Sequence, residues 1–140
     1  MSQERTILII DDNPGDIRLT EEILKSSKFD SKLVAIFNGD DAIAYLNKAL
    51  ENKTLPNLII LDLNLPRLNG IEVLDIIKSD SVLKLLPVVI LTSSEAEYDI
   101  HKSYQNHANL YLTKPVDFDE YFKVVTNIEK FWFSIAKLPY

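Results

Sequence analysis

The chain has 140 residues, of which 46% are hydrophobic and 26% charged, so we expect one globular domain with a single core. It has no cysteine, which excludes disulfides and thiolate metal sites, and its net charge of -6 argues against non-specific binding to nucleic acid. No apolar run approaches the roughly 18 residues of a membrane span, and the polar start does not resemble a signal peptide, so we expect a cytoplasmic protein.

Short apolar runs alternate with longer amphipathic segments along the chain. The runs predict five strands, at residues 7–10, 33–37, 58–61, 88–91 and 109–112. Continuous apolar runs are typical of strands buried on both faces of a parallel sheet. Because strands and helices alternate, we expect a doubly wound α/β fold with helices on both faces of a five-stranded sheet. The strand order expected for it is the flavodoxin-like order 2-1-3-4-5.

The segments between the strands carry signals for the start of a helix. Asn13 precedes a proline, which is typical of an N-cap followed by proline at the first helical position. Asn38 and Asn69, each followed by glycine, open the second and third predicted helices. Ser94 with Glu97 resembles a capping box for the fourth helix.

Polar side chains follow the predicted strands at the points where they end. Asp11 and Asp12 follow the first strand, Asp62 follows the third, Thr92 ends the fourth, and Lys114 comes after the fifth. In open α/β sheets, ligands bind outside the carboxyl ends of the strands, where the strand order reverses. We therefore expect these five side chains to converge on one edge of the sheet.

Three clustered carboxylates need a compensating charge. Two unit charges about 4 Å apart repel by about 4 kcal/mol at an effective dielectric constant of about 20. Raised pKa values, the Lys114 ammonium or a bound cation could offset this repulsion. Mg²⁺ fits best, because it takes one or two carboxylates, keeps several waters and then accepts a phosphate oxygen. The lack of cysteine and of paired histidines disfavours zinc and copper.

These residues, in this order and spacing, resemble the receiver domain of two-component response regulators over roughly residues 6–128. The segment 62–66, Asp-Leu-Asn-Leu-Pro, followed by Gly70, is similar to the loop around the phosphoacceptor of that family. The resemblance implies that Asp62 is the nucleophile that takes a phosphoryl group from a phosphohistidine of a sensor histidine kinase. It further implies a Mg²⁺ ion held by Asp11, Asp12, Asp62 and the backbone carbonyl of Asn64.

The resemblance also implies roles around the phosphoryl group. Thr92 would hydrogen-bond one phosphoryl oxygen, and Lys114 would pair with another. Thr92 and Tyr111 would form the conformational switch. The Lys114–Pro115 peptide bond would be cis. The protein would act as a stand-alone switch for an unknown downstream partner, with no catalysis beyond phosphotransfer to itself and autodephosphorylation.

A fifth helix is predicted from about residue 117 and is strongly apolar. One seam runs along it at helical spacing, made of Phe118, Tyr121, Val125, Ile128, Trp132 and Ile135. From Glu129 onward the helix is longer than a crossover helix needs, and we expect Phe131, Trp132 and Phe133 in this part, of which Phe131 and Phe133 lie off the seam, to contribute to a homodimer or a kinase contact. Similar aromatic tails occur in small response regulators that partner phytochrome-type kinases. Residues 1–140 would then form one receiver domain, with a core at about 6–128 and an extended C-terminal helix and tail at about 129–140.

Each feature also has an ordinary structural explanation, as a helix cap, a turn residue or a surface charge, and only their joint occurrence at one edge favours a site. His101 and His107 lie away from that edge and are expected to be exposed. Two other functions remain open. A haloacid-dehalogenase-like phosphatase expects a second acid two residues after the nucleophile, where this chain has Asn64. A degenerate receiver that serves only as a docking module would lack the acids or the lysine.

Overall fold

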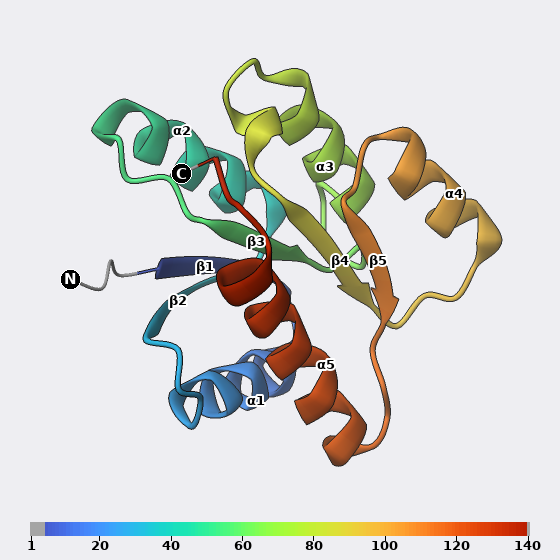
Figure 1. Cartoon of the computed structure of the whole chain (residues 1–140). Coiled ribbons are helices and arrows are strands. Elements are labelled where there is room, and N and C mark those ends of the chain that lie inside the picture. Colours follow the sequence, from blue (N-terminus) through green and yellow to red (C-terminus); the bar gives the residue numbers. More distant parts are fainter. Residues whose placement is uncertain (1–4, 140) are drawn as a thin grey trace.

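The computed structural model describes residues 5–139 and contains a five-stranded parallel sheet between two layers of helices (Figure 1). Its strand order, β2-β1-β3-β4-β5, confirms the prediction. The strands are β1 (Arg5–Ile10), β2 (Ser31–Ile36), β3 (Leu58–Leu61), β4 (Val88–Thr92) and β5 (Leu110–Thr113). All residues of β1, β3 and β4 are buried except the first two of β1, as expected for continuous apolar runs.

The helices lie on both faces of the sheet. In the view of Figure 1, α1 and α5 lie below it, and α2, α3 and α4 lie above it. They are α1 (Pro14–Lys25), α2 (Gly39–Asn52), α3 (Gly70–Ser79), α4 (Glu97–Gln105) and α5 (Phe118–Lys130), with short 3-10 and π segments at η1 (Leu83–Leu85) and η2 (Phe131–Ile135). Two hydrophobic clusters result, one on each face of the sheet. No helix within residues 5–139 is both long enough and apolar enough to cross a membrane.

Asparagine side chains cap three of the helices where the sequence predicts them. The side chain of Asn13 accepts a hydrogen bond in the first turn of α1, and Asn38 does the same for α2. Asn69 forms a reciprocal capping box at the start of α3. The capping box predicted for α4 is wrong. Ser94 lies two residues before the cap residue, and its hydroxyl donates instead to Asp99 Oδ2 at 2.6 Å.

The C-terminal helical run, α5 followed by η2, departs from the predicted seam at both ends, and at its start Phe118 is 56% exposed. Tyr121, Val125 and Ile128 are buried as predicted, but Ile135 is 63% exposed and Phe133 only 6% exposed. The cause is the π turn of η2, which contains one more residue per turn and brings Phe133, five residues after Ile128, to the inner face. The prediction that Phe133 belongs to an intermolecular surface is therefore wrong, because it packs inside its own chain.

Candidate functional site

Two aspartates and one lysine meet at the carboxyl ends of the strands, as predicted. Lys114 Nζ donates hydrogen bonds to Asp11 Oδ2 and Asp62 Oδ2, both at 2.8 Å. Asp11 and Asp62 are buried, with exposed side-chain fractions of 3% and 5%, and the Lys114 side chain is only 10% exposed. Residues 103 and 52 positions apart in the sequence thus form one compact charged cluster.

Strand register explains the convergence. Ile10 of β1 pairs with Leu61 of β3, so the next residue of each strand is an aspartate at the same edge. The ladder continues into the site, since the Asp62 backbone N–H donates to Ile10 O at 2.9 Å. The Lys114 backbone N–H likewise donates to Thr92 O at 2.7 Å, which places the lysine beside the end of β4.

Asp16 of α1 is a third carboxylate on the same ammonium, and it was missed as a site residue. Lys114 Nζ donates to Asp16 Oδ2 at 2.7 Å, and the Asp16 side chain is 27% exposed. In the sequence, Asp16 is explained by its place in the first turn of α1, where an acid stabilises the helix dipole. The usable signal was its position three residues after the cap Asn13, in a turn that starts directly at the site.

The charges in the cluster shift each other's protonation. Burial raises the pKa of Asp11 to about 6, although its bonds with Lys114 and with the Asn13 backbone N–H act in the opposite direction. Burial lowers the pKa of Lys114, but hydrogen bonds to the three carboxylates outweigh it and raise the pKa overall. The lysine is therefore a fixed cation that compensates the repulsion among the acids.

The donor set can accept a hard divalent cation. Mg²⁺ needs one or two carboxylates, with water for its other positions. Asp11 and Asp62 provide two, since both lie within hydrogen-bond distance of one ammonium. Within residues 5–139, no three His, Cys, Asp or Glu side chains are arranged around one metal position. Asp12 is exposed and is not one of the Lys114 partners, so its part in metal binding stays a prediction.

The loop after β3 fixes the carboxylate of Asp62. The backbone N–H of Asn64 donates to Asp62 Oδ1 at 3.1 Å, and the Asn64 side chain donates to Ser93 Oγ at 3.3 Å. A Cβ atom at Gly70 would collide with the carbonyl oxygen of Asp62 and lie 2.5 Å from Leu63 Cα. Glycine is therefore required where α3 begins against this loop.

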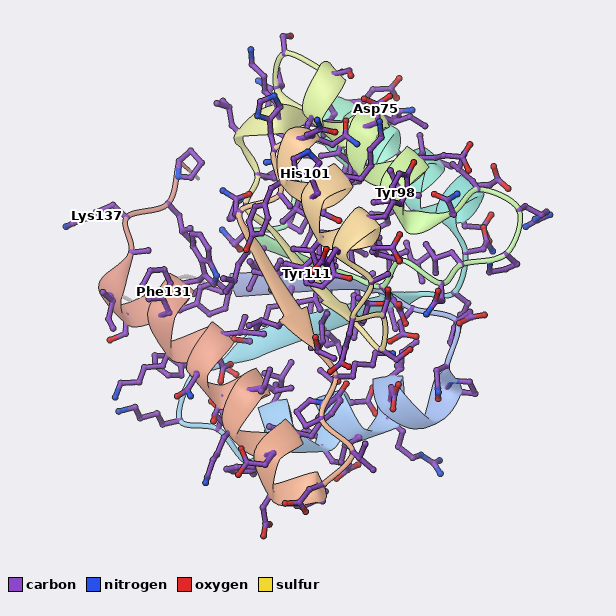
Figure 2. All side chains as sticks on the ribbon, turned by 90° about the vertical axis from the view of Figure 1, so that its right-hand side faces the viewer. Asp75, Tyr98, His101, Tyr111, Phe131 and Lys137 are labelled. Atoms are coloured by element: carbon purple, nitrogen blue, oxygen red, sulfur yellow. The ribbon has the colours of Figure 1, made fainter. Side chains whose placement is uncertain are left out.

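Thr92 and Tyr111 are connected through Ser94. Thr92 is fully buried, and its Oγ1 accepts a long hydrogen bond from the Ser94 backbone N–H at 3.5 Å. The Tyr111 hydroxyl donates to the Ser94 carbonyl oxygen at 2.9 Å. Burial raises the pKa of Tyr111. Figure 2 shows Tyr111 of β5 beside α4, and Phe131 where α5 ends and η2 begins.

Two further predictions are settled by the backbone and by burial. No cis peptide bond occurs within residues 5–139, so the Lys114–Pro115 bond is trans and the prediction of a cis bond is wrong. Trans is the preferred form of X–Pro bonds by about 0.5–1 kcal/mol, and Lys114 reaches its three partners with it. His101 and His107 are exposed, as predicted.

Comparison with known proteins agrees with this geometry. Residues 7–126 match the response regulator receiver domain. Response regulator Rcp1 of Synechocystis sp. is 44% identical over 137 residues, which cover 96% of this chain and 93% of Rcp1. The crystal structure of the phosphorylated cyanobacterial phytochrome response regulator RcpA has a TM-score of 0.93 at 44% identity, covering 99% of this chain and 100% of RcpA. The crystal structure of the Mn(2+)-bound form of response regulator Rcp1 has a TM-score of 0.90 at 44% identity, covering 97% of this chain and 99% of that one.

A doubly wound parallel sheet with two buried aspartates and a lysine at its carboxyl edge defines an α/β domain of the receiver type. The chain belongs to the response regulator receiver domain family. Its similarity to a phytochrome response regulator confirms the predicted resemblance to that subgroup.

Proposed function

We propose that the chain is a phosphorylation switch whose phosphoacceptor is Asp62. The observation that supports this most is the direct bond between Lys114 and the buried Asp62 carboxylate at the carboxyl edge of the sheet. A second carboxylate, Asp11, shares that ammonium. The cluster has the charges that a phosphoryl transfer needs, a nucleophilic carboxylate beside a fixed cation.

In the proposed reaction, a carboxylate oxygen of Asp62 attacks the phosphorus of a phosphohistidine on a sensor histidine kinase. The P–N bond breaks, the electron pair returns to the imidazole, and an acyl phosphate forms on Asp62. Lys114 stabilises the charge on the phosphoryl oxygens. Asp11, Asp12, Asp62 and the backbone carbonyl of Asn64 would hold Mg²⁺, which when bound neutralises charge on the transferred group.

The switch would run through Ser94. A phosphoryl group on Asp62 offers new acceptors to the Thr92 hydroxyl, which would turn away from the Ser94 backbone N–H. The Tyr111 hydroxyl donates a hydrogen bond to the carbonyl oxygen of Ser94 at 2.9 Å, so a shift of Ser94 would change the position of Tyr111. The expected result is a change of the surface formed by α4 and β5, which an unidentified downstream partner reads.

The partner and setting follow from the subgroup. RcpA is a phytochrome response regulator, and we infer that a phytochrome-type histidine kinase in the cytoplasm phosphorylates this chain. We further infer that residues 1–140 form one receiver domain, with its core at about 6–128. Its own catalysis would be limited to phosphotransfer to itself and autodephosphorylation.

We also propose that the C-terminal run forms a homodimer surface. Phe131 is 47% exposed, and together with Trp132 it lines an apolar groove of about 270 Å³ beside Leu110 and Leu112 of β5. β5 is an edge strand of the sheet. Trp132→Ala should lower the apparent mass in sedimentation equilibrium, whereas Tyr98→Ala, which removes a 72% exposed aromatic side chain on α4, should leave it unchanged. An identical mass for wild type and Trp132→Ala would exclude this surface.

A small phosphodonor with a divalent cation separates the proposed function from its two alternatives. A phosphoryl adduct that persists after the donor is removed supports the switch. Rapid multiple turnover of the donor supports a phosphatase of the Asp-nucleophile type, and the absence of any adduct supports a docking module. Asn64 already disfavours the phosphatase, because it occupies the position where a phosphatase of this type has an acid, and an amide cannot protonate the leaving group.

A further inference from the structure

Asp16 is the one partner of Lys114 to which the proposed reaction assigns no role. It lies on α1, its carboxylate accepts from Lys114 Nζ at 2.7 Å, and its side chain is 27% exposed. An acid in the first turn of a helix stabilises the helix dipole even when its side chain faces solvent, so this effect needs no bond with Lys114. A direct bond with a lysine that is only 10% exposed therefore calls for a second explanation.

The three carboxylates use up the donors of the lysine. An ammonium group has three N–H protons, and those of Lys114 are matched by Asp11 at 2.8 Å, Asp16 at 2.7 Å and Asp62 at 2.8 Å. Before transfer, while Asp62 is still a carboxylate, a phosphoryl oxygen that arrives beside it finds no free proton on this ammonium. One of the existing bonds must therefore open before Lys114 can bind the phosphoryl group.

Burial decides which bond opens. Until the acyl phosphate forms, Asp62 is still a carboxylate, and the side chains of Asp11 and Asp62 are only 3% and 5% exposed, so losing the bond with Lys114 would leave either of these buried charges dependent on Mg²⁺ alone. Asp16 is the most exposed of the three, and water can take over the hydrogen bond that it loses. Its backbone stays in place, since its N–H donates to Asn13 Oδ1 at 3.1 Å and its carbonyl accepts from Thr20 Oγ1 at 2.9 Å. Only the Asp16 side chain needs to move.

We propose that Asp16 is a positioning residue that holds Lys114 in the unphosphorylated state and competes with the phosphoryl group for it. This inference rests on the proposed function, because it assigns a regulatory role at the same site. Asp16 would keep the third proton of the Lys114 ammonium occupied at rest and slow the formation of the acyl phosphate. It also adds one negative charge that repels an anionic phosphodonor.

The test measures the rate of adduct formation from a small phosphodonor for wild type, Asp16→Asn and Asp16→Ala. Asn keeps a neutral acceptor for Lys114, whereas Ala keeps none, so the rate should rise in the order wild type, Asn, Ala. We expect about a tenfold increase for Ala, which corresponds to about 1.4 kcal/mol. Loss of a negative charge should also lower the donor concentration at half-maximal rate in both variants.

The control is Asp75→Asn, which removes the same charge from an exposed position on α3 (Figure 2). Its rate should equal that of wild type. If the rates of both Asp16 variants equal or fall below the wild-type rate, the role proposed for Asp16 is wrong. The proposed function would still stand in that case, provided that the adduct forms on Asp62. A wild-type chain that forms no adduct would instead refute the proposed function.

Should the Asp16 variants fail to fold, the wild-type chain still gives an answer. Its Asp16 side-chain ¹³C carboxyl signal should shift when the acyl phosphate forms, because the bond with Lys114 opens. An Asp16 signal that stays in place while the Asp62 adduct forms would show that the Lys114–Asp16 bond persists, and the inference would be wrong.

Discussion

Replacing Lys114 by methionine tests how much of the site depends on one cation. Lys114→Met keeps a flexible apolar chain of similar length but removes the ammonium that three carboxylates share. Two of these, on Asp11 and Asp62, are almost fully buried. The variant therefore leaves acids facing one another with no counter-charge.

The expected cost follows from the burial of the partners. Removing one member of a buried ion pair costs about 3–5 kcal/mol, because an uncompensated charge remains in the interior. Protonation of Asp11, whose pKa burial already raises to about 6, relieves part of the repulsion in the variant. We therefore expect the free energy of unfolding at neutral pH, with divalent metal removed, to fall by about 3 kcal/mol, the lower end of that range.

Urea unfolding measures this loss, and Mg²⁺ provides a second reading of the same cause. A ligand that binds only the folded state adds about 2.7 kcal/mol at one hundred times its dissociation constant. Because Mg²⁺ no longer competes with the ammonium for Asp11 and Asp62, it should stabilise Lys114→Met more than wild type. Lys123→Met is the control, since Lys123 is 66% exposed and forms a surface ion pair with Glu120. Equal unfolding free energies for wild type and Lys114→Met would refute the reasoning.

Three further outcomes can be measured on the same protein. Gly70→Ala should cost about 1–3 kcal/mol of stability and slow adduct formation, because its Cβ forces the Asp62 loop to move; unchanged rates would contradict this. Phe133→Ala should cost about 3–5 kcal/mol in urea unfolding, whereas the half-exposed Phe131→Ala should cost less than about 1 kcal/mol. With metal removed, the folded chain binds the Asp11 proton more tightly than the unfolded chain, so the free energy of unfolding should fall as the pH rises from 3.8 to about 6. In Asp11→Asn, this part of the pH dependence of the unfolding free energy should disappear. An identical pH dependence in wild type and Asp11→Asn would show that other groups cause it.

The strands could be predicted because buried parallel strands leave a direct signal, whereas their order was taken from the flavodoxin-like fold that alternating strands and helices indicate. β3 is an uninterrupted apolar run that ends where Asp62 begins, and the structure places its end there. β1 and β2 begin two residues earlier than predicted. The ladder extends over polar residues, as in the pair Arg5 and Ser31, and no apolar pattern marks that extension.

The features that were missed depend on contacts between distant segments. Asp16 has an ordinary local explanation as an acid in the first turn of α1, and only the folded chain shows its bond with Lys114. Ser94 has the residue type of a cap, but in the structure its hydroxyl binds Asp99. The π turn of η2 changes which aromatic residue faces inward, and the spacing of the aromatic residues fits a regular helix equally well.

The most direct test of the central claim is to find which residue carries the phosphoryl group after transfer from a phosphorylated histidine kinase. Borohydride reduction converts an aspartyl phosphate into homoserine, which peptide mass spectrometry can place in the sequence. We predict conversion at position 62 in wild type and none anywhere in Asp62→Asn. Conversion at another aspartate of the wild-type chain, or unchanged phosphotransfer to Asp62→Asn, would contradict the account.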